Sequence, residues 1–405
     1  MMMNRRAFAV LLGLLLSFNT WAGSKEGEAE NDSTKINLEY GSKGFQMTTS
    51  DNKFQLNIRG RLQFRYTTPF EDDPVTFEDL NGPTKNSLNI NRARLKIGGH
   101  AYKPWLKYYF EYDLWASRVL DFRIMVEKWP WLNFKIGQWK VEYSRERSVS
   151  SGKQQMLERS IINRPFTVDR QQGMTVYGHL DGGGLANFDY NLSMLTGSGR
   201  GGGENDDSKL MYVGRLQWNV LGDGVPISGS DLNHVKNPLA SIAFAGATNT
   251  SPYTRFSSSG GGSLAGYGEG VLGQYSVDQW LFETAFQYKS FSWHSEYHQK
   301  QVQDNVNDMV TNLEGFFGQG GYILNHQAAK ENNPLYEVAV RYSQYRPNKA
   351  ITMNRKEEYA LAVNCFFNGH KNKLTGDVTY FEFDNEIAAQ ESTGWRFRLQ
   401  YDISF

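Results

Sequence analysis

Apolar and polar residues alternate along residues 54–66, and the same alternation returns until the end of the chain. In this first stretch one parity is aliphatic or aromatic, and the other is cationic or amide-bearing: Gln55, Asn57, Arg59, Arg61, Gln63 and Arg65. Successive side chains of a β-strand point to opposite faces, so the pattern predicts a strand with one apolar and one cationic face. A single strand of a soluble antiparallel sheet can look the same, so the rest of the chain must decide.

Alternating segments continue through the chain with no helical period between them. Beyond residue 66 they cover 92–97, 105–114, 122–127, 132–136, 174–180, 188–194, 210–220, 240–247, 279–289, 291–301, 313–323, 335–345, 357–368, 372–383 and 394–405. Long polar connections alternate with short turns, which is typical of outer-membrane barrels, and merging 266–277 into a long loop gives about 16 strands. The sequence therefore predicts an all-β fold, a transmembrane antiparallel β-barrel over residues 54–405 with long extracellular loops.

The final strand supports this interpretation. Trp395, Phe397, Leu399, Tyr401 and Ile403 alternate with polar residues, and the last residue is a phenylalanine. A terminal aromatic residue on an alternating strand resembles the signal by which outer-membrane barrels are recognised for assembly. In a soluble protein the same strand would expose an aromatic ladder and favour aggregation.

The cost of placing arginine in lipid decides which face is which. An arginine at the middle of the membrane costs about 2–4 kcal/mol, so Arg59, Arg61 and Arg65 together would cost roughly 6–12 kcal/mol on the outer face. We therefore expect the charged parity to face the interior. The same argument turns inward Arg92, Arg94, Lys96, Lys107, Arg123, Lys135, Arg215, Arg341, Arg396 and Arg398, and the acids Glu111, Asp113, Asp121, Glu127, Asp189, Glu283, Glu337 and Asp377.

The inward cations concentrate on the first strands and the last, which become neighbours when a barrel closes. One wall should then be cationic, and a cationic wall in a confined channel favours anions. Alternatively, inward arginines and acids pair across strands as structural ladders. Both interpretations stand for any single residue, but few acids lie beside the run that includes Arg59, Arg61 and Arg65 in the sequence.

The bulk composition limits the class of protein. The formal net charge is +0, which argues against a general nucleic-acid binder, and Cys365 is the only cysteine, so no internal disulfide can form. An apolar run at residues 7–18 follows Arg5 and Arg6 and predicts a signal peptide over residues 1–22. Residues 23–53 are predicted as a disordered lead-in with a short hairpin, and the mature chain as exported.

Two long polar segments stand out among the connections. Residues 141–170 contain six cationic residues: Arg145, Arg147, Lys153, Arg159, Arg164 and Arg170. The segment is too long and too basic for an ordinary hairpin loop, and loops of this length are usually functional or disordered. A second long loop, rich in serine and glycine, spans residues 249–276.

A possible metal motif lies at His294, Glu296 and His298, which share one face of a strand. Alternate strand residues are about 7 Å apart, and a zinc site needs a third or fourth ligand, so we predict no metal site there. We also predict no cofactor and no enzyme, because no convergent nucleophile and base can be named.

Several motifs resemble the phosphate-selective porins O and P. They are Phe-Gln-Leu-Asn-Ile-Arg-Gly-Arg-Leu-Gln (54–63), Asn-Arg-Ala-Arg-Leu-Lys-Ile-Gly-Gly (91–99), Phe-Lys-Ile-Gly-Gln (134–138), Ser-Arg-Glu (144–146), Met-Leu-Glu-Arg (156–159) and the terminal strand. The resemblance implies a trimeric barrel of about 16 strands. Its third loop would fold inward, an arginine ladder would lead to a central site of arginines and an aspartate, and lysines would lie below.

Carried over by position, the resemblance implies that Arg61, Arg159 and Asp121 form the constriction. The other pore-lining cations would be Arg59, Arg65, Arg92, Arg94, Lys96, Arg396 and Arg398 on the approach, with Lys135 at the exit. The 249–276 loop departs from the family, since Arg255 is its only arginine where the family keeps several.

These observations together predict a bacterial outer-membrane porin that passes small anions passively, with phosphate or polyphosphate as leading candidates. Its partners would be outer-membrane lipid, lipopolysaccharide and two further copies of itself, and no nucleic acid. A general diffusion porin without anion preference and a barrel enzyme or adhesin remain as alternatives.

Overall fold

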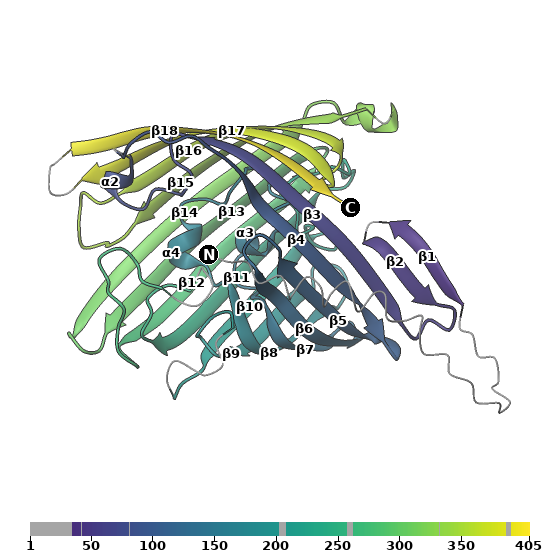
Figure 1. Ribbon diagram of the computed structural model, residues 1–405. Helices are drawn as coiled ribbons and strands as arrows, with labels where there is room; N and C mark the ends of the chain where they lie inside the picture. Colours follow the sequence, from purple (N-terminus) through teal and green to yellow (C-terminus); the bar gives the residue numbers. More distant parts are fainter. Residues whose placement is uncertain are drawn as a thin grey trace, which may run out of the picture. The chain divides into compact units, whose positions relative to one another are not determined.

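The computed structural model describes residues 35–41, 43–80, 82–201, 208–256, 262–331, 333–385 and 390–405. The predicted signal peptide, residues 1–22, and the lead-in up to residue 34 lie outside the described residues. Most described residues belong to antiparallel strands (Figure 1). The strands are β1 (Ile36–Gly41), β2 (Gly44–Thr49), β3 (Gln55–Thr68), β4 (Ser87–Ala101), β5 (Lys103–Asp113), β6 (Arg118–Trp129), β7 (Leu132–Lys140), β8 (Arg170–Asp181), β9 (Asn187–Leu195), β10 (Met211–Leu221), β11 (Leu239–Ser251), β12 (Tyr275–Tyr288), β13 (Phe291–Asp304), β14 (Met309–Ile323), β15 (Leu335–Arg346), β16 (Lys356–Asn368), β17 (Asn372–Asn385) and β18 (Gln390–Ser404).

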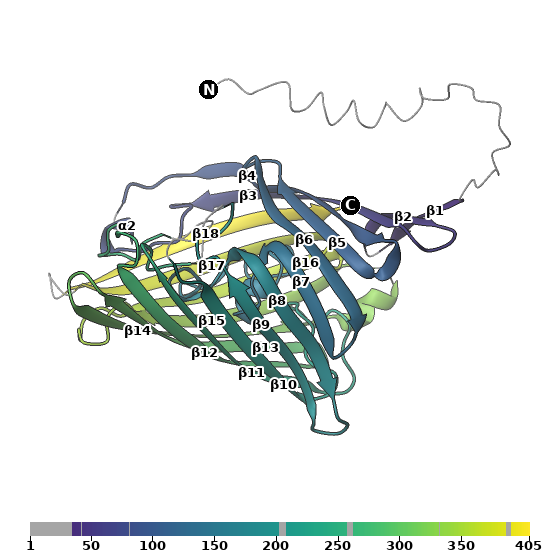
Figure 2. The same cartoon turned by 90° about the horizontal axis from the view of Figure 1, so that it is seen from below.

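The sheet closes on itself. Each strand from β3 to β18 pairs with the next, and β18 pairs back with β3 from Phe397 opposite Thr68 to Ser404 opposite Arg61. Figure 2 shows this ring of tilted strands from below. The sixteen strands confirm the predicted antiparallel barrel, and closure leaves no unpaired edge along the wall.

The hairpin of β1 and β2 lies outside this ring of sixteen. Strand β2 pairs with β3 from Phe45 opposite Ile58 to Thr48 opposite Gln55, just beyond the point where β18 ends. Its apolar residues continue the outward parity of β3. The hairpin therefore extends the wall at the end of the barrel where the chain terminates.

Burial separates the two parities of the wall. On β3, Leu62 and Phe64 are 37% and 43% exposed, whereas Gln63 and Arg65 are 0% and 3% exposed. The exposed parity is aliphatic and aromatic on the other strands as well, which suits hydrocarbon. The charged parity lies inside, where the rest of the described chain covers it.

The two rims differ in the length of their connections. Residues 69–86, 141–169, 196–210 and 252–274 are long connections on one rim, here called the long-loop rim. The opposite, short-turn rim has tight turns but also two longer connections, residues 222–238 and 324–334. The helices of the described part are α2 (Phe77–Leu80), α3 (Arg145–Ser148), α4 (Asn163–Phe166) and the 3-10 helix η2 (His326–Glu331). None of them is long and apolar enough to cross a membrane.

Residues 141–169, here called the constriction loop, fold into the barrel and carry α3 and α4. Ile162 and Phe166 of this loop are fully buried in a cluster with Phe317 of β14 and Tyr345 of β15. A Cβ on Gly315 would lie 2.6 Å from the Phe166 ring. Glycine at this inward position of β14 therefore lets the loop pack directly on the wall.

Candidate functional site

Inward carboxylates of the strands β12 to β17 hold the backbone of the constriction loop. Glu296 accepts hydrogen bonds from the Glu146 amide at 2.7 Å and the Ser144 hydroxyl at 2.8 Å. Glu358 accepts from the Ile161 amide at 2.8 Å. Both carboxylates are satisfied by these bonds together with a basic side chain, His294 and His298 for Glu296 and Arg341 for Glu358. These acids are therefore anchors of the loop, and the loop lies on the β12–β17 side of the interior.

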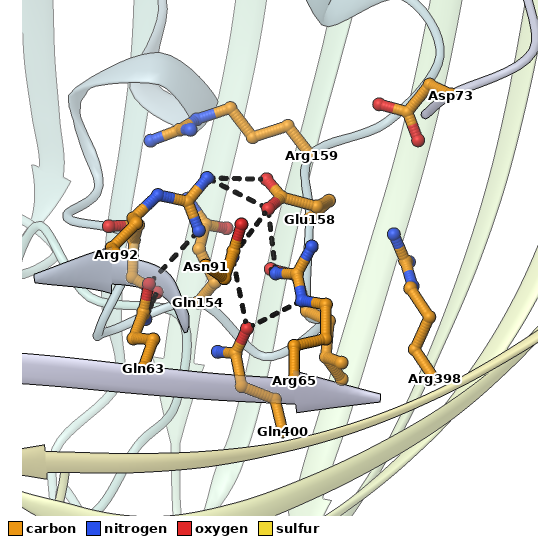
Figure 3. A network of polar contacts seen from close by, with 12 residues as sticks. Gln63, Arg65, Asp73, Asn91, Arg92, Gln154, Glu158, Arg159, Arg398 and Gln400 are labelled. Atoms are coloured by element: carbon orange, nitrogen blue, oxygen red, sulfur yellow. Dashed lines mark hydrogen bonds and ion pairs between the residues drawn. The ribbon is translucent and has the colours of Figure 1, made fainter. Parts of the chain in front are cut away.

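On the opposite side, Glu158 of the constriction loop binds the cationic wall (Figure 3). Its Oε1 lies 2.7 Å from Arg65 of β3 and 2.8 Å from Arg92 of β4. Arg65 also donates to Gln400 of β18 at 2.8 Å, and Arg92 donates to Gln63 at 3.1 Å. The loop itself supplies the acid that the sequence near these arginines lacks. Few acids lie near these arginines in the sequence, but the folded chain brings Glu158 to them. The interpretation that inward arginines pair with acids therefore holds for Arg65 and Arg92.

A cavity of about 300 Å³ opens between the constriction loop and the walls of β4 to β7. Eight cationic side chains line it against two carboxylates, Asp113 and Asp169. The cations are Arg92, Arg94, Arg118, Lys140, Arg147, Arg159, Arg170 and Arg200. We call it the cationic cavity, because its lining carries a large excess of positive charge.

Part of this charge is neutralised locally. Arg94 lies 3.0 Å from Glu111, and Arg170 lies 3.5 Å from Asp169 and bonds Asp121 on its other side. Arg147 is paired with Asp169. These ion pairs orient the guanidinium groups. They also make the net positive charge of the cationic cavity smaller than its eight cationic side chains would suggest.

Three cations of the cationic cavity have side chains with no hydrogen bond or ion pair within the described part of the chain: Arg118, Lys140 and Arg200. They come from the start of β6, the end of β7 and the loop after β9. Burial and the nearby charge of Arg118 lower the pKa of Arg200 to about 10, so Arg200 stays charged at neutral pH. Positive groups that face one cavity without protein partners are free to bind an anion.

The three residues expected at the constriction do not share one cavity. Arg159 lines the cationic cavity and donates to the backbone oxygens of Glu146 and Val149 at 3.0 and 2.9 Å. Arg61 donates to Ser150 and Ser151 and lines a different cavity, on the short-turn side of the loop. Asp121 is buried and bonds Arg123 and Arg170. Only Arg159 thus lies where an anion in the cationic cavity can reach it.

The remaining predicted cations occupy three kinds of position. Arg396 and Arg398 are 1% and 0% exposed and are paired with Asp73 and Asp377, so they contribute positive potential without contact. Lys135 is buried and lies 2.6 Å from Glu142. Arg59 and Lys96 line two cavities of about 540 and 310 Å³ on the short-turn side. The cationic wall thus follows β3 to β5 past the constriction loop.

Sequence reasoning missed Arg118, Lys140 and Arg200. Arg118 and Lys140 stand at the ends of strands and Arg200 stands in the 196–210 connection, where alternation no longer says whether a side chain faces the interior.

The 222–238 loop also enters the barrel, from the short-turn rim. Arg145 of the constriction loop donates to the backbone oxygen of Val225 at 3.2 Å and to that of Pro226. The Gly229 amide donates to the Lys153 oxygen at 2.9 Å, and Ser230 donates to Glu337 at 2.8 Å. No pattern in the sequence predicts this contact. The two loops therefore meet inside the barrel and narrow it from both ends.

Shortening the 222–238 loop should enlarge the passage. Replacing residues 224–236 by a short glycine–serine turn removes lining from two cavities of about 680 and 540 Å³ while β10 and β11 remain paired. We expect a higher single-channel conductance in planar bilayers. Shortening the exposed turn at 183–185 on the same rim is the matched control and should leave conductance unchanged. Equal conductance of both variants and the parent would contradict this role of the loop.

The histidines of the possible metal motif bind the loop anchor. His294 and His298 place their Nε2 atoms 3.1 and 2.8 Å from the Glu296 carboxylate, whose oxygens also receive the constriction loop. Among the described residues no group of three or more histidine, cysteine or acidic side chains is arranged to hold a metal ion. The arrangement serves to position Glu296.

Comparisons with known proteins agree with the architecture. Residues 61–403 match the family described as phosphate-selective porin O and P. Porin O of Pseudomonas aeruginosa is 28% identical over 115 residues, which cover 27% of this chain and 25% of that relative. The match thus spans about a quarter of the relative's length.

Solved structures share the fold at low identity. An anion-selective porin from Comamonas acidovorans superposes with a TM-score of 0.55 at 11% identity, covering 86% of this chain and 99% of that one. The outer membrane channel DcaP of Acinetobacter baumannii gives 0.53 at 12% identity, covering 88% and 99%. At such identities the likeness shows the barrel architecture alone.

Proposed function

The chain belongs to the phosphate-selective porin O and P family and is an outer-membrane porin, and we propose that it passes small anions through the cationic cavity. The cavity supports this proposal through one observation, the excess of eight cationic side chains over two carboxylates in its lining. In a narrow passage with low-dielectric walls such an excess raises the local anion concentration. The process is passive, and no chemical step is assigned to any residue.

The binding positions follow from the unpaired groups. Arg118, Lys140 and Arg200 would contact the anion directly, and Arg159 would contribute from the surface of the constriction loop. Arg61 and Asp121 instead act as positioning residues, Arg61 by bonding the loop at Ser150 and Asp121 by orienting Arg170. Arg59 and Lys96 would continue the path toward the short-turn rim.

Phosphate and polyphosphate are the leading solutes. Arginine presents a planar fork of donors that fits phosphate oxygens in pairs, and the family is described by phosphate selectivity. The name of the Comamonas porin supports anion passage more generally. Assembly as a homotrimer in outer-membrane lipid and lipopolysaccharide is part of the same proposal and is supported by the family resemblance.

A general diffusion porin is the second candidate. The pairs of Glu158 with Arg65 and Arg92, and of Glu111 with Arg94 and Lys96, favour it because they neutralise part of the wall. Under this alternative the channel would pass cations and anions at similar rates.

Ion selectivity separates the two. We expect the full-length porin to show a reversal potential of anion-selective sign across a potassium chloride gradient, and phosphate to reduce its chloride current. Changing Arg118, Lys140 and Arg200 together to glutamine should move the reversal potential toward zero, because the free positive charge of the cavity is lost.

The matched control is Lys289→Gln, which removes an exposed charge in the tight turn between β12 and β13. It should leave the reversal potential unchanged. A reversal potential near zero for the parent, or no shift in the triple variant, would favour general diffusion.

A further inference from the structure

A second cavity lies at the long-loop rim and differs from the cationic cavity in chemistry. Its volume is about 80 Å³, and it is enclosed by the 69–86 loop, the constriction loop around α4, the 252–274 loop and the ends of β15 to β17. A water molecule needs about 10–15 Å³ by this measure, so the cavity holds a group of several heavy atoms. We call it the rim pocket.

The body of the rim pocket is apolar. Ile161 and Pro165 of the constriction loop, Leu264 of the 252–274 loop, Tyr345 of β15 and Phe383 of β17 line it. Phe383 is 1% exposed, and Leu264 and Tyr345 are buried in the same interior cluster. Apolar and aromatic walls with a few polar groups are typical of sites for small organic molecules.

Three cationic side chains line the pocket, Arg164, Arg255 and Lys356, and the Lys356 ammonium donates to the Val75 oxygen. Neither the Arg164 nor the Arg255 side chain has a hydrogen bond or an ion pair within the described part of the chain, and the buried Nε of Arg255 has no partner. Burial and the nearby charge of Arg164 lower the pKa of Arg255, which shows that the two guanidinium groups repel each other. The one carboxylate of the lining, Asp73, is occupied at 2.9 Å by Arg396.

The position of Arg255 is built into its loop. The amides of Thr254 and Arg255 both donate to the Gly262 oxygen, at 3.1 and 2.9 Å. A Cβ on Gly262 would lie 2.7 Å from the Arg255 guanidinium, and the φ of Gly262 is +142°. Glycine there lets the guanidinium rest against the loop and face the pocket. The side chain is therefore held in place without an acidic partner.

From these observations we infer that the rim pocket binds a small carboxylate with an apolar, ring-sized body. The carboxylate takes the donors of Arg255 and Arg164, for which its two oxygens are suited. The apolar body displaces water from Ile161, Leu264 and Phe383. Inorganic phosphate has charge but no apolar part, so it could contact the arginines but would not fill the apolar part of the pocket. The inference rests on the proposed function in one respect: it takes the rim pocket to lie on the route by which anions enter the barrel.

Benzoate is a suitable probe for direct binding. We expect saturable binding of benzoate to the full-length porin in detergent by calorimetry, with inorganic phosphate unable to compete at equal concentration. Arg255→Gln should weaken benzoate binding by about tenfold or more, the loss expected when a charged hydrogen-bonding partner is removed. Phe383→Leu keeps an apolar side chain in the wall but removes the ring, and it should also weaken binding.

Arg355→Gln is the matched control. It removes one cation at the same rim, where Arg355 lies 3.6 Å from Glu357 and outside the lining of the rim pocket. It should bind benzoate as the parent does. Arg255→Lys tests for loop disruption, because it keeps the charge and should retain part of the affinity.

Three results would overturn the inference: no benzoate binding by the parent, equal binding by Arg255→Gln, or competition by phosphate with no effect of Phe383→Leu. Each can occur while the reversal potential remains anion-selective, so failure here is distinguishable from failure of the proposed function. Conversely, benzoate binding with a reversal potential of zero would support the pocket and reject anion passage through the cationic cavity.

Discussion

Replacing Glu158 by glutamine is expected to destabilise the constriction loop by about 3–5 kcal/mol, the usual cost of removing one partner from a buried ion pair. Glu158 neutralises Arg65 and Arg92, whose side chains are 4% and 16% exposed. Glutamine has the same shape but no charge, so two positive groups would be left facing each other in the interior. The thermal unfolding midpoint in detergent should fall, and the loop should become accessible to protease.

The control for this prediction is Glu314→Gln on β14. Glu314 also binds two cations, Arg346 at 3.2 Å and Lys349 at 3.1 Å, but these are 36% and 38% exposed. Exposed pairs contribute about 0–1 kcal/mol, so this variant should unfold close to the parent. Equal shifts of the unfolding midpoint in the two variants would show that burial does not make the Glu158 ion pairs more stabilising than exposed ones.

Glu296→Gln should release the α3 end of the constriction loop. The buried Glu296 carboxylate accepts from Ser144, the Glu146 amide, His294 and His298 at 2.7–3.1 Å. A carboxamide keeps one oxygen and turns an NH₂ group toward donors. Each buried donor left without an acceptor costs about 1–3 kcal/mol. We expect a lower unfolding midpoint and larger fluctuations of single-channel current.

A suitable comparison for Glu296→Gln is Glu127→Gln on β6. Glu127 also faces the interior, but it binds Lys107 and Tyr177, both on strands, and does not touch the constriction loop. Its variant should keep a quiet current. A noisy current in Glu127→Gln, or a quiet one in Glu296→Gln, would contradict this interpretation. Either result would show that the current does not depend on the anchoring of the constriction loop by Glu296.

The inward carboxylates that hold the constriction loop show which part of the site the sequence could predict and which part it could not. Glu283 and Glu337 were expected to face inward from their parity, and the structure places both inside. Their contacts include the Arg145 amide and Gln155, residues more than a hundred positions away along the chain. Alternation reports the face of a strand but not what lies opposite it. The glycines at 315 and 321 on the inward parity of β14 were a readable sign that something packs there.

The sequence by itself determined the strands, their inward and outward faces and the even number that closes the ring. Those features depend on a period of two and on the cost of charge in hydrocarbon, both of which are local properties. Only the tertiary structure decided which arginines are free. The constriction loop binds Arg61, Arg65 and Arg92, whereas the side chains of Arg118, Lys140 and Arg200 have no partner among the described residues. Whether a charge is neutralised depends on which group folding brings within a few ångströms of it. Such a distance between residues far apart in the chain cannot be read from the local sequence pattern.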